Sequence, residues 1–239
     1  MENNRVHGSE DKAGGGASFV PALRFKWATK LYDGLMQNFA RDRVLRDMTV
    51  SAVTPLPLET ILDFGCGTGS LTVALAQAGM GFSNTGFSVT GYDIDPEVLT
   101  LAEEKARRLS VRVMPSFRQA DVTDIKSFPP TAKGNFDCVT SSLVFHHLNN
   151  SQKKKALKVA KDLMKPGGRF VLVDWGPGSN VFLKAAFWLV RLFDGFAVTR
   201  DNARGYLPAM IKEAGFTHIR ARPALNTMFG TIWLFEAKK

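Results

Sequence analysis

Short apolar runs alternate with longer helical patterns along most of this chain. Apolar runs of strand length occur at residues 61–64, 88–93, 116–120, 136–142 and 168–174. Between them, residues 70–78 and 96–108 carry apolar side chains at helical spacing, and a further helix follows Asn150 and Ser151. Strands that alternate with helices build parallel sheets, so the pattern predicts an α/β fold.

The pattern changes towards the C-terminal end. Residues 205–214 predict a helix that Gly215 ends. Two strand-like runs follow, at residues 216–222 and 230–237, and they predict an antiparallel pair.

A glycine loop joins the first predicted strand to the helix at residues 70–78. It contains Gly65, Cys66, Gly67 and Gly69, and Asp63 lies just before it. Glycines let the backbone turn sharply and approach a ligand closely, and the free amides of the next helix face the same space. The spacing is G-x-G-x-G, which differs from the G-x-G-x-x-G loop that binds a dinucleotide pyrophosphate.

Acidic residues stand at the ends of the next two strands. Asp93 ends the second strand and Asp121 follows the third. Asp95 precedes Pro96, which predicts that Asp95 caps the helix at residues 96–108. Residues 80–86 lengthen the connection to the second strand, and we interpret them as a surface loop. The alternative is that they reshape the second strand, in which case Asp93 and Asp95 would exchange roles.

The glycine loop and these acids resemble motifs of the class I S-adenosylmethionine (SAM) dependent methyltransferases. Further segments are similar to the ubiquinone and menaquinone biosynthesis C-methyltransferases: Ser141 to Leu148, Lys165 to Arg169, Asp194 to Phe196, and Asp201 with Asn202. The likeness covers most of residues 25–237. It implies a Rossmann-like, doubly wound, mostly parallel sheet of seven strands, with an antiparallel C-terminal strand and helices on both faces.

The resemblance also implies roles for individual residues. The glycine loop would hold the amino-acid end of SAM, with Asp63 serving its ammonium through the loop. Asp93 would accept the ribose hydroxyls, Asp121 would contact the adenine amino group, and Tyr32 would close over the cofactor. The predicted cofactor-binding residues are Tyr32, Asp63, Gly65, Cys66, Gly67, Gly69, Asp93, Ile94, Asp121, Val122 and Ser141.

Chemistry is expected where the fourth strand ends, since ligands of open parallel sheets gather beyond the carboxyl ends of the strands. His146 and His147 follow that end, and they are the predicted catalytic residues. Imidazole titrates near neutral pH, so His146 is the preferred base if the acceptor must lose a proton. The alternative is a histidine pair that opens a helix and bonds to backbone.

Two segments extend the predicted domain. Residues 1–18 are polar and predict a disordered tail, which leaves residues 19–239 as a single domain with an N-terminal helical cap. An apolar run at residues 181–196 predicts a helix in a lid-like insertion at about 178–205. Because Lys184 and Arg191 interrupt this run, we do not expect it to span a membrane, although contact with a membrane surface is a second interpretation.

Composition narrows the classes of function. Two cysteines among 239 residues argue against a disulfide scaffold and favour a cytoplasmic protein. The sequence lacks the Cys/His spacing of a zinc site, so we expect no metal. The net charge is +9, but the basic residues are dispersed, and the run from Lys153 to Lys155 reads as a solvated helix face.

The sequence therefore predicts a SAM-dependent methyltransferase that acts by in-line displacement on a small, apolar or aromatic acceptor and releases S-adenosylhomocysteine. A nucleic acid substrate is disfavoured, because the positive net charge is the main feature that supports one, and charge alone is weak evidence for nucleic acid binding. An RNA methyltransferase and a noncatalytic SAM-binding protein are the alternatives.

Overall fold

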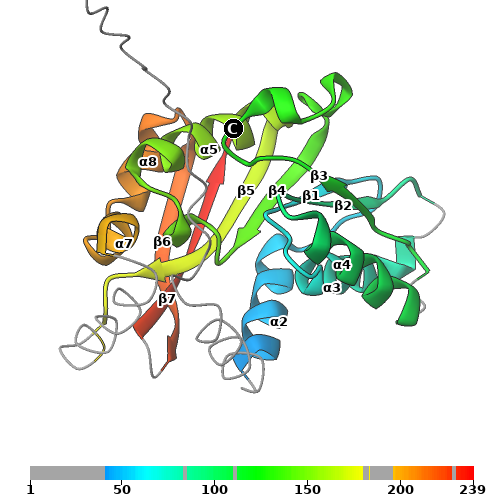
Figure 1. Ribbon diagram of the computed structural model, residues 1–239, viewed down its shortest axis with the longest axis horizontal. Helices are drawn as coiled ribbons and strands as arrows, with labels where there is room; N and C mark the ends of the chain where they lie inside the picture. The colour runs from blue at the N-terminus through cyan, green and yellow to red at the C-terminus, as the bar shows by residue number, and fades with distance from the viewer. Residues whose placement is uncertain (1–40, 83–84, 110–111, 180–182, 184–195, 228–229) are drawn as a thin grey trace, which may run out of the picture.

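The computed structural model describes residues 41–82, 85–109, 112–179, 183, 196–227 and 230–239. These residues form a seven-stranded sheet in the order β3-β2-β1-β4-β5-β7-β6 (Figure 1). The strands are β1 (Thr60–Phe64), β2 (Ser88–Asp93), β3 (Ser116–Gln119), β4 (Phe136–Ser142), β5 (Met164–Gly176), β6 (Thr217–Thr227) and β7 (Gly230–Lys238). β1 to β5 pair in parallel, whereas β7 runs antiparallel to both β5 and β6. The predicted fold class is confirmed.

Helices cover both faces of this sheet. They are α2 (Arg41–Val53), α3 (Ser70–Ala78), α4 (Pro96–Arg108), α5 (Asn150–Leu163), α7 (Phe196–Ala203) and α8 (Leu207–Glu213). Short 3-10 turns complete the connections: η1 (Met80–Phe82), η2 (Ile125–Ser127), η3 (Pro130–Ala132) and η4 (Phe145–His147). Figure 1 shows α2, α3 and α4 on one side of the molecule and α5, α7 and α8 on the other.

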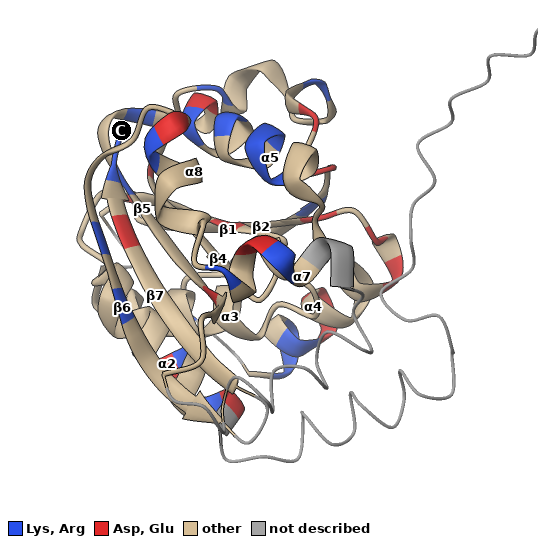
Figure 2. Cartoon of the chain, turned by 90° about the vertical axis from the view of Figure 1, so that its left-hand side faces the viewer, with Lys and Arg blue, Asp and Glu red and all other residues tan. Residues whose placement is uncertain are grey.

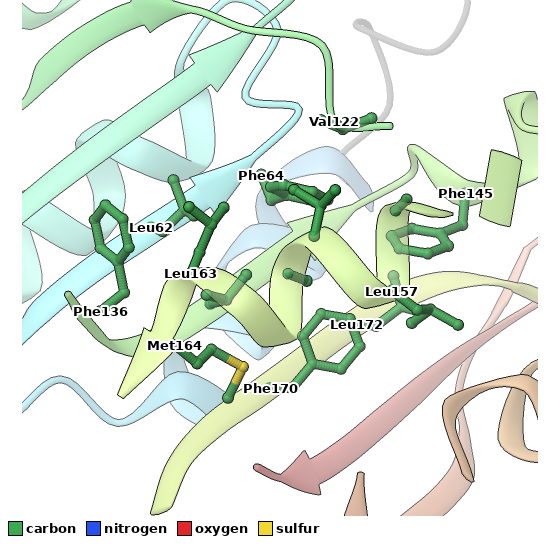
Figure 3. Close-up of a cluster of buried hydrophobic side chains, with 14 of the residues drawn as sticks. Leu62, Phe64, Val122, Phe136, Phe145, Leu157, Leu163, Met164, Phe170 and Leu172 are labelled. Atoms are coloured by element: carbon green, nitrogen blue, oxygen red, sulfur yellow. The ribbon is translucent and has the colours of Figure 1, made fainter. Parts of the chain in front are cut away.

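Two apolar clusters fill the layers between sheet and helices. One cluster joins Leu62 and Phe64 of β1 to Leu157 of α5 and Met210 of α8. Figure 3 shows part of it, including Phe64, Leu157 and Phe170. The second cluster lies on the opposite face, where Ile61 meets residues of α2 and α3. Neighbouring residues of β1 therefore point to opposite layers, which is the period of two expected of a strand buried on both sides.

The helix starts follow local capping chemistry. Asp95 accepts a hydrogen bond from the Glu97 amide at 2.8 Å, so it caps α4 as predicted. Asn149 and Gln152 form a reciprocal capping box at the start of α5. These caps fix where both helices begin, and α3 and α4 have the bounds that the sequence predicted.

Several boundaries differ from the prediction, by one or two residues at most ends and by more in β5 and β6. β5 begins at Met164 rather than Gly168, because Met164 already pairs with Phe136, and a register shift before Cys138 accommodates the extra residues of β5. β6 continues past Arg222, because an edge strand tolerates Pro223. β3 ends one residue earlier, at Gln119.

The lengthened connection before β2 leaves that strand intact. β2 pairs with β1 in continuous register from Ser88 to Tyr92, so Asp93 stays at the strand end and Asp95 stays at the helix cap. The tail at 1–18, Tyr32 and nearly all of the apolar run at 181–196 lie outside the described residues. α2 overlaps only the end of the predicted N-terminal helical cap.

An ion pair ties three elements together at the edge where the parallel strands begin. Both nitrogens of the Arg169 fork donate to Glu59, at 2.5 and 2.9 Å, and Arg169 also donates to the Val53 carbonyl. The Arg169 side chain is 31% exposed and that of Glu59 is 11% exposed. Because the pair is bidentate and partly desolvated, it contributes more than a surface ion pair does.

We therefore expect Arg169→Met to lower the free energy of unfolding by about 2 kcal/mol, because the partly buried Glu59 carboxylate loses its partner. In a domain of this size that corresponds to a fall in Tm of about 4–8 °C, measured by calorimetry. Arg107→Met is the matched control, since its pair with Glu103 is 62% and 51% exposed. An equal fall in Tm for both variants would contradict this account.

Candidate functional site

The carboxyl ends of the parallel strands bring the predicted site residues to one edge of the sheet. β2, β1, β4 and β5 lie next to one another in that order. The glycine loop follows β1, Asp93 ends β2, and η4 with both histidines follows β4. The cofactor residues and the histidines therefore lie on adjacent strands, as the α/β pattern requires.

The glycine loop is held to the end of β2 by three consecutive amides. The amides of Gly65 and Cys66 donate to the Tyr92 carbonyl at 2.8 and 2.9 Å. The Gly67 amide donates to Asp93 Oδ2 at 2.8 Å. The loop is thus fixed by its backbone before any ligand binds.

Each glycine of the loop has a positive φ, and two of them also lie against other side chains. A Cβ on Gly65 would meet Val144 Cγ2 at 2.6 Å, and one on Gly69 would meet Ala102 Cβ at 2.7 Å. A Cβ on Gly67 would meet no atom of the described residues within 4 Å, so none of them fills the space beside the loop there. A side chain at this point would project into the space that a ligand needs.

Asp63 is buried beneath the loop. Its Oδ2 accepts a hydrogen bond from Thr72 Oγ1 at 2.7 Å, at the start of α3. Burial raises the pKa of Asp63 to about 7; the Thr72 hydrogen bond opposes the shift and the charge of Asp93 adds to it. A cation that binds nearby would therefore favour the ionised carboxylate. This agrees with the predicted role of Asp63, which is to balance the charge of an ammonium from below the loop.

Asp93 and Ile94 form the next part of the edge. Besides Gly67, Asp93 binds the Asp95 amide through Oδ1 at 3.1 Å. Each carboxylate oxygen has a further lone pair that can accept from a ribose hydroxyl. Ile94 is 42% exposed, so it offers an apolar surface beside that carboxylate.

Asp121 and Val122 follow β3. Asp121 Oδ1 accepts from the amide and the hydroxyl of Thr123, at 2.7 and 2.8 Å, which forms a turn. Val122 is only 9% exposed and packs into the cluster of Phe64, above which Figure 3 places it. Ile94 thus offers much more apolar surface for an adenine ring than Val122 does.

Two predicted residues support the site from behind. Ser141 is fully buried and donates to the Phe64 carbonyl at 2.7 Å, so it joins β4 to β1 and has no exposed surface for a cofactor. Cys66 is also buried, and burial raises the pKa of its thiol, with Asp63 and Asp93 adding to the shift. It stays a neutral, small loop side chain.

His146 has an orienting partner that the sequence analysis did not identify. Its Nδ1 lies 2.9 Å from Oδ1 of Asp174, which is fully buried in β5. Asp174 Oδ2 accepts from the amides of Phe145 and His146, and Oδ1 also accepts from the Trp175 amide. Because a carboxylate only accepts, Nδ1 of His146 carries a proton in this contact, which in the neutral ring leaves the lone pair on Nε2.

His147 differs from its neighbour. The centroid of its ring lies 3.9 Å from that of His146. The residue is exposed to solvent, although protein atoms surround its ring on most sides. Burial lowers the pKa of His147 well below its usual range, and the charges of His146 and Lys153 add to that shift. His147 is therefore a neutral imidazole at neutral pH.

Lys153 corrects the interpretation of the lysine run. Lys154 and Lys155 are exposed as predicted, but Lys153 is fully buried. Its Nζ lies 3.7 Å from Asp201 Oδ2 of α7, and burial lowers the pKa of the ammonium against the attraction of Asp201 and Asp174. Lys153 lies on the face of α5 that packs against the protein, whereas the next two lysines lie on the solvent face. Three identical residues in a row do not reveal this difference in the sequence.

The sequence pattern around Asp174 could have marked it as a site residue. It is an acid at the end of the apolar run Phe170 to Val173, as Asp93 is in β2. Asn202 of α7 donates to Asp174 Oδ1 at 3.2 Å, and nothing in its local sequence announces that contact.

The edge fits the chemistry of SAM in three respects. The space beside Gly67 is open to a ligand. The carboxyls of Asp63 and Asp93 suit an ammonium and a ribose diol, and Ile94 suits an adenine face. Among the described residues, no group of three or more His, Cys, Asp or Glu could hold a metal ion.

Comparison with known proteins points the same way. Residues 61–168 match the family described as "Methyltransferase domain". The chain is 30% identical over 228 residues to an uncharacterized methyltransferase of Bacillus licheniformis, covering 94% of this chain and 99% of that protein. It is 28% identical over 202 residues to the ubiquinone/menaquinone biosynthesis C-methyltransferase of Zymomonas mobilis, covering 77% and 78%.

A solved structure shares the fold. Magnesium protoporphyrin IX methyltransferase from Synechocystis, determined with bound SAH, superposes with a TM-score of 0.58 at 24% identity, covering 83% of this chain and 81% of that one. In the described part of the chain, every helix is too short or too polar to cross a bilayer.

Asp63 gives a testable pH dependence of SAM binding. With a pKa of about 7, the carboxyl is mostly protonated at pH 6 and mostly ionised at pH 8. A bound ammonium favours the ionised form, so the wild-type affinity should fall about tenfold, relative to Asp63→Asn, between pH 8 and pH 6. Calorimetry at both pH values gives the ratio of dissociation constants, in which the titration of SAM itself cancels. A ratio that is the same at both pH values would exclude this role.

Proposed function

The chain belongs to the S-adenosylmethionine-dependent methyltransferases, and from the arrangement of its site we propose that it methylates a small, apolar or aromatic acceptor with His146 as the base. The observation that carries this proposal is the 2.9 Å contact between His146 Nδ1 and Asp174. A backbone-bonded histidine pair, the alternative from the sequence, would not need a buried carboxylate behind the ring.

The cofactor half of the site is assigned to the glycine loop and the strand-end acids. Gly67 leaves room for the ligand, Asp93 accepts the ribose hydroxyls, and Ile94 covers one adenine face. Asp121 accepts from the adenine amino group, and Asp63 balances the ammonium from below the loop. When bound, SAM supplies a methyl carbon that its sulfonium makes electrophilic.

The acceptor half is assigned to η4. His146 Nε2 takes the proton from the acceptor atom, and the electron pair left on that atom forms the new bond to the methyl carbon. The bond from carbon to sulfur breaks in line, so S-adenosylhomocysteine leaves and His146 returns its proton to solvent. Asp174 holds the ring and stabilises the imidazolium that forms, while alignment of the two partners lowers most of the barrier.

Buried charge around the histidines supports this step. Among the described residues, Asp174 and Asp201 carry two negative charges and Lys153 carries one positive charge, all inside the protein. The Asp174 carboxylate against Nδ1 stabilises the positive charge that develops on the His146 ring. His147 stays neutral beside it and offers its exposed surface to the acceptor.

A small acceptor is favoured by the distribution of charge. Figure 2 shows lysines and arginines spread over α5, β6 and the helices below the sheet, with acidic residues among them. An RNA-binding face would gather such residues into one basic patch. We place the protein in the cytoplasm, because both cysteines, Cys66 and Cys138, are free.

The cofactor assignment predicts that Asp93→Ala weakens SAM binding about 100-fold, because two hydrogen bonds to a charged acceptor are lost. Calorimetry measures the dissociation constant. Asp95→Ala is the matched control: it removes the cap of α4, so it should lower stability by about 1 kcal/mol and leave the SAM affinity unchanged. Unchanged affinity in Asp93→Ala would remove the ribose assignment.

The catalytic assignment predicts that His146→Gln lowers methyl transfer by about 10²–10⁴-fold without weakening SAM binding. The assay incubates the protein with methyl-labelled SAM and separate pools of phenols, quinols and RNA. His147→Gln should keep activity within about tenfold, because it lacks the contact with Asp174. Full activity in His146→Gln, or label found in RNA alone, would refute the proposed function.

A further inference from the structure

Asn202 lies behind the proposed base, on a helix that the sequence motifs do not connect to the chemistry. It is fully buried in α7. Its Nδ2 donates to Asp174 Oδ1 at 3.2 Å and to the Trp175 carbonyl at 2.9 Å. Both acceptors belong to the end of β5.

The orientation of this amide is fixed by its partners. If it were flipped, its oxygen would face the Asp174 carboxylate and the Trp175 carbonyl, and neither of them can donate. The NH2 group must therefore point to β5. Asn202 Oδ1 then has no hydrogen-bond partner among the described residues, although it is buried.

That unpaired oxygen makes asparagine an expensive residue for packing. A buried amide oxygen without a donor costs about 1–3 kcal/mol. A leucine has the same branching and the same number of side-chain heavy atoms without that cost. The benefit of asparagine must therefore come from its two donated bonds, and one of them goes to the carboxylate that orients His146.

The donors to Asp174 approach from different elements. The amides of Phe145 and His146 come from η4, and the Trp175 amide comes from β5 itself. Asn202 approaches Oδ1 from α7, on the same oxygen that contacts His146 Nδ1. A donor there limits rotation of the carboxylate and so fixes the direction in which Oδ1 accepts from the histidine.

The next residue anchors the helix itself. Asp201 Oδ2 lies 3.7 Å from Lys153 Nζ and accepts from Asn150 Nδ2 at 3.3 Å, and both partners belong to α5. Two consecutive residues of α7 thus bind α5 and the end of β5. The placement of α7 is thereby linked to the placement of Asp174.

Given the proposed function, we infer that Asn202 is a positioning residue for the base: through Asp174 it holds His146 in the tautomer with the proton on Nδ1. It touches neither cofactor nor acceptor. Its removal should release the histidine while leaving the fold and the cofactor site in place. The inference extends the base machinery from η4 and β5 to α7.

Nitrogen NMR of the histidine side chains tests the inference without an acceptor. The chain has four histidines, and the spectrum of His146→Gln identifies the signals of His146. Long-range proton–nitrogen spectra distinguish a proton on Nδ1 from one on Nε2. We expect the Nδ1–H form in the wild type and a mixture of tautomers in Asn202→Leu, which calorimetry should show to be folded.

Asn150→Ala is the matched control, because it removes a hydrogen bond from a side-chain amide to Asp201 and leaves the contacts of Asp174 unchanged. Its His146 signals should match those of the wild type. If leucine does not fit, Asn202→Ala removes the same donors without overpacking, and the same mixture of tautomers is expected. A wild-type tautomer in a folded Asn202 variant would overturn the inference, as would an Nε2–H form in the wild type.

Kinetics separate this inference from the proposed function. With an acceptor from the labelled screen, Asn202→Leu should lower kcat about tenfold and leave KM unchanged. If His146→Gln is inactive but Asn202→Leu has wild-type kcat and spectra, the proposed function stands and the positioning role fails. If His146→Gln is active while Asn202→Leu alters the tautomer, the base assignment fails and the positioning geometry stands.

Discussion

The acceptor side of this structure depends on one buried carboxylate. Asp174 lies inside the protein at the end of β5, where an uncompensated charge would cost several kcal/mol. Its compensation comes from amides of η4 and β5, the His146 ring and the Asn202 amide. Because these donors belong to three elements, burial of this charge links η4, β5 and α7 to one another. The need to solvate one anion therefore determines the geometry of the histidine.

The cofactor side follows the same logic with backbone groups. The loop amides of Gly65, Cys66 and Gly67 would be unpaired donors at a tight turn, and the end of β2 accepts all three. Since β2, β1, β4 and β5 are neighbours, the loop and the histidines meet at one edge without long connections. The order of the strands thus places the cofactor loop next to the base. Side chains from adjacent strand ends can therefore contact both reaction partners.

Local chemistry explains what the sequence could predict. Gly69, Asp95 and Pro96 act within a few residues of their own position, so the bounds of α3 and α4 were predictable. The burial of Lys153, the partner of His146 and the inward hydroxyl of Ser141 depend on contacts between distant segments. A pattern of residue types does not encode such contacts. Asp174 is intermediate, since an acid after an apolar strand marks the edge but not its partner.

Burial has opposite consequences for the two key acids. Asp63 receives a hydrogen bond from Thr72, which offsets only part of its desolvation, so its pKa rises to about 7 and its charge is incomplete until a cation arrives. Asp174 is surrounded by donors, and its charge is compensated within the protein itself. A site for a cationic ligand benefits from the first arrangement, because binding completes the ionisation. A base that must keep one tautomer benefits from the second, because the partner of its ring must not change when the acceptor binds.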